Sequence, residues 1–136
     1  MSETATETRS VVVEREIPYP PERIWRALTQ THLIEEWLMK TDFEPVVGHA
    51  FGFRADWGAV ECEVLDVERN RTLSYSWGDH DLQSIVTWTL TATEMGTRLR
   101  LEQTGFRQDQ PRYYGGATAG WPGFFDRLEQ VLARME

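Results

Sequence analysis

The feature that most constrains this chain is an amphipathic stretch near its C-terminal end, residues 120–135 (GWPGFFDRLEQVLARM). Apolar residues recur there at the three- and four-residue steps of an α-helix, and charged residues occupy the opposite face. The apolar face consists of Trp121, Phe124, Phe125, Leu128, Val131, Leu132 and Met135. Because bulky rings crowd its first turn, this face either closes a solid core or roofs a cavity, and the pattern alone leaves both alternatives open.

The middle of the chain has the two-residue period of β-strands. Apolar and polar residues alternate there, which is typical of antiparallel strands with one buried and one solvated face. With the N-terminal stretch SVVVEREIP, the expected strands are 10–18, 48–55, 59–67, 69–77, 84–93 and 97–104. In the third strand the inward set changes phase after Val64, so that Leu65 and Val67 continue it, and this shift predicts a β-bulge.

Two short helices are expected between the first two strands. Residues 20–29 (PPERIWRALT) place Pro21 at a helix start, where its missing N–H costs nothing, and residues 31–39 (THLIEEWLM) repeat the helical period. Residues 1–8 are polar and predict a disordered tail, with one domain over 9–136. The glycine-rich stretch 113–120 (YYGGATAG) is interpreted as a flexible gate before the last helix.

These elements predict an α+β fold. A curved antiparallel sheet of six strands offers one apolar face, and the long C-terminal helix must lie across it because it has the largest apolar surface left to bury. The length of 136 residues suits a single core.

Composition excludes several classes of function. The net charge is −8, and residues 1–68 hold 6 Lys/Arg against 14 Asp/Glu, whereas residues 69–136 hold 8 of each. Nucleic acid and anionic membranes are therefore not expected as partners, since both require a basic face. No signal peptide or membrane-spanning apolar run is found, so a cytoplasmic location is expected.

No catalytic or metal-binding constellation is recognisable. His32 and Glu36 have helical spacing, but two ligands are too few for a closed zinc site, and no cofactor motif is found. The cluster Asp79, His80 and Asp81 is interpreted as a polar turn. The single cysteine, Cys62, has no histidine partner in sequence and is interpreted as a small buried hydrophobe.

Several stretches resemble a known superfamily. Residues 20–38 (PPERIWRALTQTHLIEEWL) look like the opening helix pair of the START-like, or helix-grip, superfamily (SRPBCC), and GTRLRLEQTGF followed by GWPGFFDRL looks like its last strand and long helix. The resemblance spans roughly residues 10–135. Its branch resembles the C-terminal domain of the activator of the heat-shock-protein-90 ATPase. The resemblance implies a cavity between sheet and helix.

The candidate ligand-binding residues are aromatic or lie on inward faces. Rings of this kind either fill a core or line a ligand cavity, and both interpretations stay open. Arg15 lies between inward positions of the first strand, so its guanidinium is expected to meet either a carboxylate or an anionic ligand, while Tyr75 and Gln103 are candidates for orienting a polar group. The full set is Arg15, Trp37, Phe51, Phe53, Tyr75, Trp77, Trp88, Gln103, Trp121, Phe124, Phe125 and Leu128.

Three functions follow as hypotheses. The first is binding of a small, largely apolar molecule beneath the last helix. The second is an interaction module of the co-chaperone kind, with a chaperone as partner. The third is a cyclase-type enzyme, which requires an acid/base pair inside the cavity. A monomer and a homodimer are both compatible with the sequence.

Overall fold

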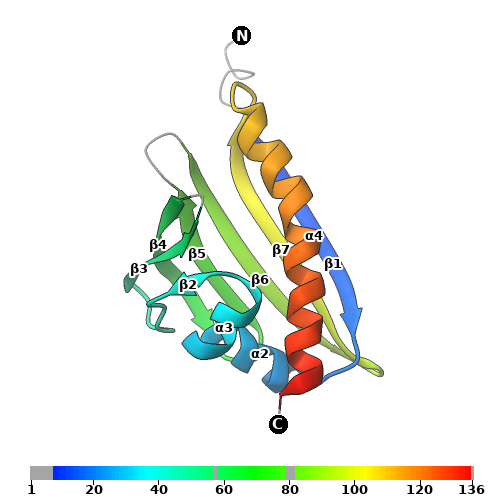
Figure 1. Cartoon of the computed structure of the whole chain (residues 1–136). Helices are drawn as coiled ribbons and strands as arrows, with labels where there is room; N and C mark the ends of the chain where they lie inside the picture. Colours follow the sequence, from blue (N-terminus) through cyan, green and yellow to red (C-terminus); the bar gives the residue numbers. More distant parts are fainter. Residues whose placement is uncertain (1–7, 57, 79–81, 136) are drawn as a thin grey trace.

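The computed structural model describes residues 8–56, 58–78 and 82–135, which form one antiparallel sheet and three helices (Figure 1). The strands are β1 Thr8–Ile17, β2 Lys40–Thr41, β3 Ala50–Ala55, β4 Gly58–Glu68, β5 Thr72–Gly78, β6 Gln83–Thr93 and β7 Gly96–Arg107. The helices are α2 Pro21–Thr29, α3 Thr31–Trp37 and α4 Pro111–Arg134. The predicted α+β class, the single antiparallel sheet and the long C-terminal helix are confirmed.

The sheet has the strand order β1-β7-β6-β5-β4-β3-β2, so the first strand of the chain pairs with the last. This pairing holds Thr8 opposite Arg107 and Ile17 opposite Thr97. Helix α4 lies across one face of the sheet beside β1, and α2 and α3 lie next to its C-terminal end (Figure 1). The first and last described elements, β1 and α4, therefore lie side by side.

The predicted number of six strands is wrong, because the sheet has seven. The additional strand, β2, has only two residues, with Lys40 opposite Arg54 and Thr41 opposite Phe53. Two residues are too short to show an alternating pattern, so no sequence period indicates this strand. Its position depends instead on the Thr41 hydroxyl, which donates to the Gly52 carbonyl at 2.7 Å.

Helix α4 begins at Pro111, and the interpretation of residues 113–120 as a flexible gate is wrong. Glycine costs about 1 kcal/mol relative to alanine in a helix, which is why this stretch reads as a loop. Proline at the first helical position and contacts with the sheet nevertheless extend the helix to 24 residues. Tyr114, for example, packs edge-on against Phe106 with ring centroids 5.8 Å apart.

The predicted bulge in β4 is confirmed by a register shift between Val64 and Asp66 in the pairing with β5. Val67 returns to the core side and is partly buried, as expected, but Leu65 remains 41% exposed. A second irregularity occurs where Ser10 faces Thr104 and Arg9 faces Phe106, so that Gly105 is skipped. Gly105 has a φ of 106°, which glycine adopts without strain, and the shift carries Phe106 to the inner face.

The core lies between the inner face of the sheet and the three helices. Its largest fully buried side chains include Trp37, Trp88, Phe53, Phe106 and Phe125. Of the tail expected over 1–8, residues 1–7 lie outside the described residues and Thr8 begins β1. The expected polar turn at 79–81 also lies outside them. In the described part of the chain, no helix has the length and apolar character needed to cross a membrane.

Candidate functional site

The second half of α4 packs solidly against the sheet. Phe125 and Leu128 have no exposed surface, and the ring of Phe125 lies 5.6 Å from that of Trp88. Trp88 in turn meets Trp37 at a right angle with 5.6 Å between ring centroids. Edge-to-face pairs of this kind stabilise a core beyond the area they bury. These candidate residues therefore form packed core, and none of them lines the cavity described below.

A second packed group lies under β3–β5. Phe51 and Phe53 are 5.4 Å apart, and each contacts Tyr75 at 5.4 and 5.8 Å respectively. Phe43, which precedes β3, completes the group at 5.0 Å from Phe51. Phe51, Phe53 and Tyr75, although candidates from sequence, are thus held by one another.

The polar atoms inside this core are paired. The indole N–H of Trp37 donates to the Ala27 carbonyl at 2.9 Å, and that of Trp88 donates to the Tyr75 hydroxyl at 3.0 Å. Burial raises the pKa of the Tyr75 hydroxyl and of the Cys62 thiol well above their ordinary values. Both groups therefore stay neutral at physiological pH, and Cys62 lacks the depressed pKa of a reactive thiolate.

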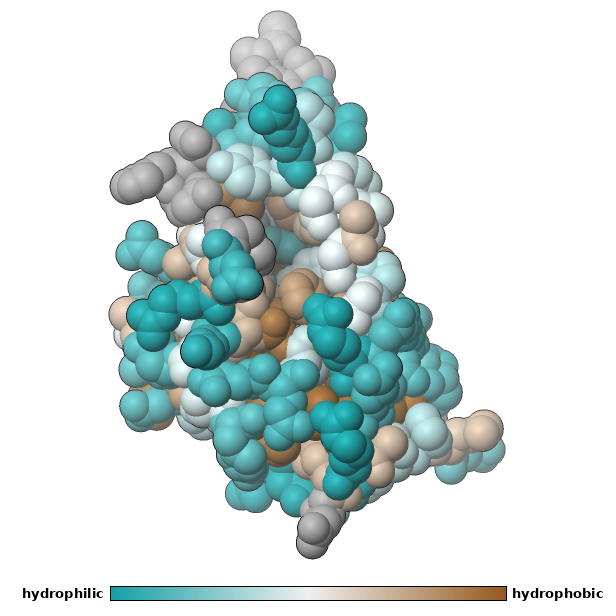
Figure 2. Space-filling model, in the orientation of Figure 1, coloured by the Kyte–Doolittle hydropathy of each residue, from teal (hydrophilic) through white to brown (hydrophobic). Residues whose placement is uncertain are grey.

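A cavity of about 380 Å³ lies between the first half of α4 and the end of the sheet where β5 and β7 end. Figure 2 views this side of the molecule and shows brown apolar residues in the depth of the hollow between α4 and the strands. Aromatic rings make up much of the wall. The lining residues are Met39, Val60, Trp77, Leu82, Gln103, Phe106, Arg112, Tyr113, Gly116, Ala117, Gly120, Trp121 and Phe124.

A hydrogen-bond chain fixes the inner wall. The Gln103 carbonyl oxygen accepts from the Trp121 indole N–H at 2.8 Å, and its amide nitrogen donates to the Ser84 hydroxyl at 2.9 Å. Ser84 donates to the Trp77 carbonyl at 2.6 Å. Because Gln103 is 2% exposed and both its side-chain ends are bonded, its amide and the Trp121 ring are held in one orientation.

The cavity exists partly because α4 carries small residues on the side that faces it. Gly116, Ala117 and Gly120 face it, and a Cβ added at Gly116 would have no atom within 4 Å. The neighbouring Gly115 also has open space around it but does not line the cavity. The wall at Gly116 is therefore open because the helix carries no side chain there.

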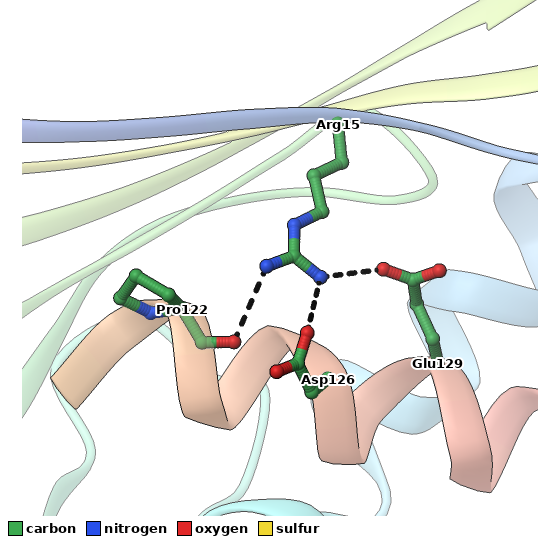
Figure 3. Close-up of polar contacts among 4 residues, drawn as sticks. All are labelled: Arg15, Pro122, Asp126 and Glu129. Atoms are coloured by element: carbon green, nitrogen blue, oxygen red, sulfur yellow. Dashed lines mark hydrogen bonds and ion pairs between the residues drawn. The ribbon is translucent and has the colours of Figure 1, made fainter.

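Arg15 lies at the edge of the sheet and binds α4 (Figure 3). Its guanidinium donates to Glu129 at 2.7 Å, to Asp126 at 2.8 Å and to the Pro122 carbonyl at 3.3 Å. The hydrogen bonds to Glu129 and then Asp126 raise the pKa of Arg15, so it stays charged. Of the two partners expected from sequence, a carboxylate or a ligand, the structure therefore pairs Arg15 with carboxylates.

The comparisons with known proteins agree with this geometry. The model of the family described as "Activator of Hsp90 ATPase homolog 1-like protein" matches residues 18–133. The chain belongs to this family. The predicted START-like resemblance is confirmed. A comparison with curated proteins finds no match.

Solved structures share the fold across nearly the whole chain. Protein MLL2253 from Mesorhizobium loti is 61% identical with a TM-score of 0.92, covering 94% of this chain and 99% of its own. Protein BH1534 from Bacillus halodurans is 26% identical with a TM-score of 0.81, covering 91% and 96%. DynU16, a protein in the dynemicin biosynthetic locus, is 23% identical with a TM-score of 0.83, covering 92% of this chain and 47% of its own. The last likeness concerns the fold alone.

In this member of the Hsp90-activator-like family, the candidate residues from sequence separate into two groups. Trp77, Gln103, Trp121 and Phe124 line the cavity, whereas Arg15, Trp37, Phe51, Phe53, Tyr75, Trp88, Phe125 and Leu128 do not. Sequence reasoning missed Met39, Val60, Leu82 and Phe106, and all lining residues of α4 before Trp121. Gly105 was the available signal for Phe106, since a glycine inside a strand often marks a bulge that changes the inward phase.

The polar lining of this cavity is sparse. Among its described lining residues there is no carboxylate and no imidazole. In the described part of the chain, no group of three or more His, Cys, Asp or Glu side chains has the geometry to hold a metal ion. A wider hollow of about 590 Å³ at the opposite end of the sheet is lined by Pro20, Pro21, Glu22, residues 70–72 and residues 89–92. Because no aromatic ring lines that hollow, we take the α4 cavity as the candidate site.

Proposed function

We propose that this domain binds a small, largely apolar molecule in the cavity beneath the first half of α4. The observation that carries the proposal is a cavity of about 380 Å³ walled by aromatic rings. Ligand sites typically measure about 300–1,000 Å³ and combine apolar walls with few polar groups. The α4 cavity falls at the small end of that range.

The structure of the wall supports a bound molecule over simple imperfect packing. Protein interiors normally fill such space with side chains, because a void loses contacts on one side. Here the helix has Gly116 and Gly120 facing the space, which lowers its own stability relative to alanine. An apolar ligand would restore the missing contacts and remove apolar wall from water.

The cavity wall is also preformed. Gln103 holds Trp121 and contacts Ser84, so the rings need no rearrangement to meet a ligand. A preformed site loses little conformational entropy on binding, which favours affinity. Gln103 lines the cavity and supplies the polar group that orients the ligand, whereas Arg15 and Tyr75 do not line it.

A direct test uses the neutral probe N-phenyl-1-naphthylamine and two neighbouring glycines. The probe should bind the wild type with one-to-one stoichiometry and quench tryptophan emission, because Trp77 and Trp121 lie in the wall. Gly116→Leu places a side chain into the cavity and should abolish binding. Gly115→Leu, which adds the same side chain outside the wall, should leave binding intact.

Equal binding by the two leucine variants would refute the cavity as the site. If no member of a varied apolar panel binds the wild type, the interaction module of the co-chaperone kind, the second hypothesis from sequence, becomes the favoured function. Circular dichroism of both variants checks that α4 remains helical.

A further inference from the structure

One basic residue lies at the mouth of the α4 cavity. Arg112, exposed in the first turn of α4, carries the only formal charge among the described lining residues. The rest of the wall is apolar or neutral, with rings of Trp77, Trp121 and Phe124 facing the same space. A molecule seated in this cavity would thus place one end beside a guanidinium and its body against π-faces.

Arg112 has no ion pair within the part of the chain that the structure describes. Its near neighbour in sequence, Asp109, accepts instead from the Nε of Arg107 at 3.1 Å. On the second half of α4 the arrangement is different, since Arg134 pairs with Glu36 at 3.0 Å. The positive charge at the cavity mouth is therefore available to a ligand.

The position of Arg112 in the helix is unfavourable for the fold itself. The N-terminus of a helix carries a partial positive charge, which favours acidic residues in the first turn and disfavours basic ones. The first turn of α4 contains no acidic residue but does contain Arg112. Departures from such local rules concentrate at functional sites, and an anion beside this turn would be attracted by both the arginine and the helix end.

We propose that the cavity selects aromatic acids, whose flat apolar body packs against the rings and whose carboxylate pairs with Arg112. This inference rests on the proposed function and adds the class of ligand. A guanidinium binds a carboxylate through two parallel N–H donors, which gives direction as well as affinity. The cavity volume of about 380 Å³ suits one or two fused rings with a short acidic side chain.

The experiment compares 1-naphthaleneacetate with 1-naphthaleneacetamide, two probes that share one body and differ in charge. Calorimetry on the wild type should give roughly fivefold tighter binding of the acetate, a modest factor because the pair is exposed to solvent. Arg112→Gln should abolish that preference. Arg69→Gln, which removes the same charge from the exposed turn before β5 and away from the cavity, should preserve it.

Higher salt should reduce the preference in the wild type and leave Arg112→Gln unchanged, because screening acts on the charge pair alone. Equal affinity of the wild type for both compounds, or a preference that survives Arg112→Gln, would overturn the inference while leaving the proposed function standing. If neither compound binds, the inference fails, and binding of the neutral apolar panel then decides whether the proposed function stands.

Discussion

The two halves of α4 are held in different ways. Of its buried residues, Phe125, Leu128, Val131 and Leu132 follow Pro122 and Trp121 directly precedes it, whereas residues 111–120 contribute none. The second half also makes polar contacts on both sides, to Arg15 on β1 and, through the Arg127 guanidinium, to the Trp37 carbonyl. One continuous helix therefore forms cavity wall from Arg112 to Phe124 and a packed anchor from Phe125 onward, and Trp121 is both buried and part of the wall.

Pro122 marks the boundary between these halves. Proline has no N–H, so the helical hydrogen bond that would reach back to residue 118 is missing. Gly120 and Gly123 lie on either side of the proline and carry no side chain to pack; a Cβ added at Gly120 would lie 3.9 Å from the Phe124 ring, and one added at Gly123 would lie 4.0 Å from Arg127. The helix is therefore continuous through Pro122 but lacks one backbone hydrogen bond there.

A guanidinium caps the C-terminal end of α4. Arg23 of α2 donates through its Nε to the Leu132 carbonyl at 3.0 Å and also reaches the Met135 carbonyl. The last carbonyls of a helix carry a partial negative charge and lack helical partners, so a guanidinium there is stabilising. The other end of α4 has Arg112 in its first turn, where the same charge is unfavourable.

The largest expected effect is the difference in stability between alanine substitutions at two adjacent phenylalanines, Phe124 and Phe125. Phe125→Ala removes a fully buried ring and should lower the free energy of unfolding by about 3–5 kcal/mol, measured by chemical denaturation. The variant should still bind N-phenyl-1-naphthylamine under conditions where it is folded, because Phe125 does not line the cavity. A cost below about 2 kcal/mol would mean that the ring is not part of a packed core.

Phe124→Ala is the matched control. This ring is only partly buried, with Trp121 5.4 Å away and the Arg127 guanidinium 4.9 Å from its centroid. The free energy of unfolding should fall by about 1 kcal/mol, which is the size expected for an aromatic pair and an exposed cation–π contact. The affinity for the probe should fall several-fold, because this ring lines the cavity. Equal losses in the free energy of unfolding for Phe124→Ala and Phe125→Ala would contradict the proposed difference between a cavity-lining ring and a packed one.

A smaller effect of opposite sign is expected in the first half. Gly115→Ala and Gly116→Ala should each raise the free energy of unfolding by about 0.5–1 kcal/mol, because a Cβ meets open space and alanine favours the helix. Ala133→Gly, on the exposed side of the second half, should cost a similar amount. Denaturation curves that show no gain at either glycine would mean that residues 111–120 are not helical in the native state in solution.

The smallest effect concerns the ion pairs of the anchor. Arg15→Gln removes contacts to Asp126 and Glu129, whose side chains are 65% and 39% exposed, so the loss should be about 0.5–1 kcal/mol and shrink at high salt. Arg98→Gln, which removes a single longer contact of 3.9 Å to Glu16, serves as the control and should change stability less. Probe affinity should be unchanged in both variants. A salt-independent loss would assign the stabilisation to packing of the Arg15 chain over Phe125.

The sequence by itself determined the faces of the main elements. Alternation placed Trp77, Trp88 and Gln103 on the inner side of the sheet, and the helical period placed Trp121, Phe125 and Leu128 toward it. Periodicity predicts these faces because each element buries only one side. Apolar residues therefore occupy the positions that face the core, and polar residues occupy those that face solvent. The same logic predicted the bulge after Val64.

Only the tertiary structure decided which inward residues fill space and which leave it empty. Phe124 and Phe125 are neighbours of the same type, yet one lines the cavity and the other is core, because successive side chains of a helix point about 100° apart, so that Phe124 faces the cavity beside Trp121 while Phe125 faces Trp88. The helical state of residues 111–120 and the two-residue β2 were likewise invisible to local propensity. Both depend on partners distant in sequence, Phe106 for Tyr114 and Phe53 for Thr41, and such contacts exist only once the sheet has formed.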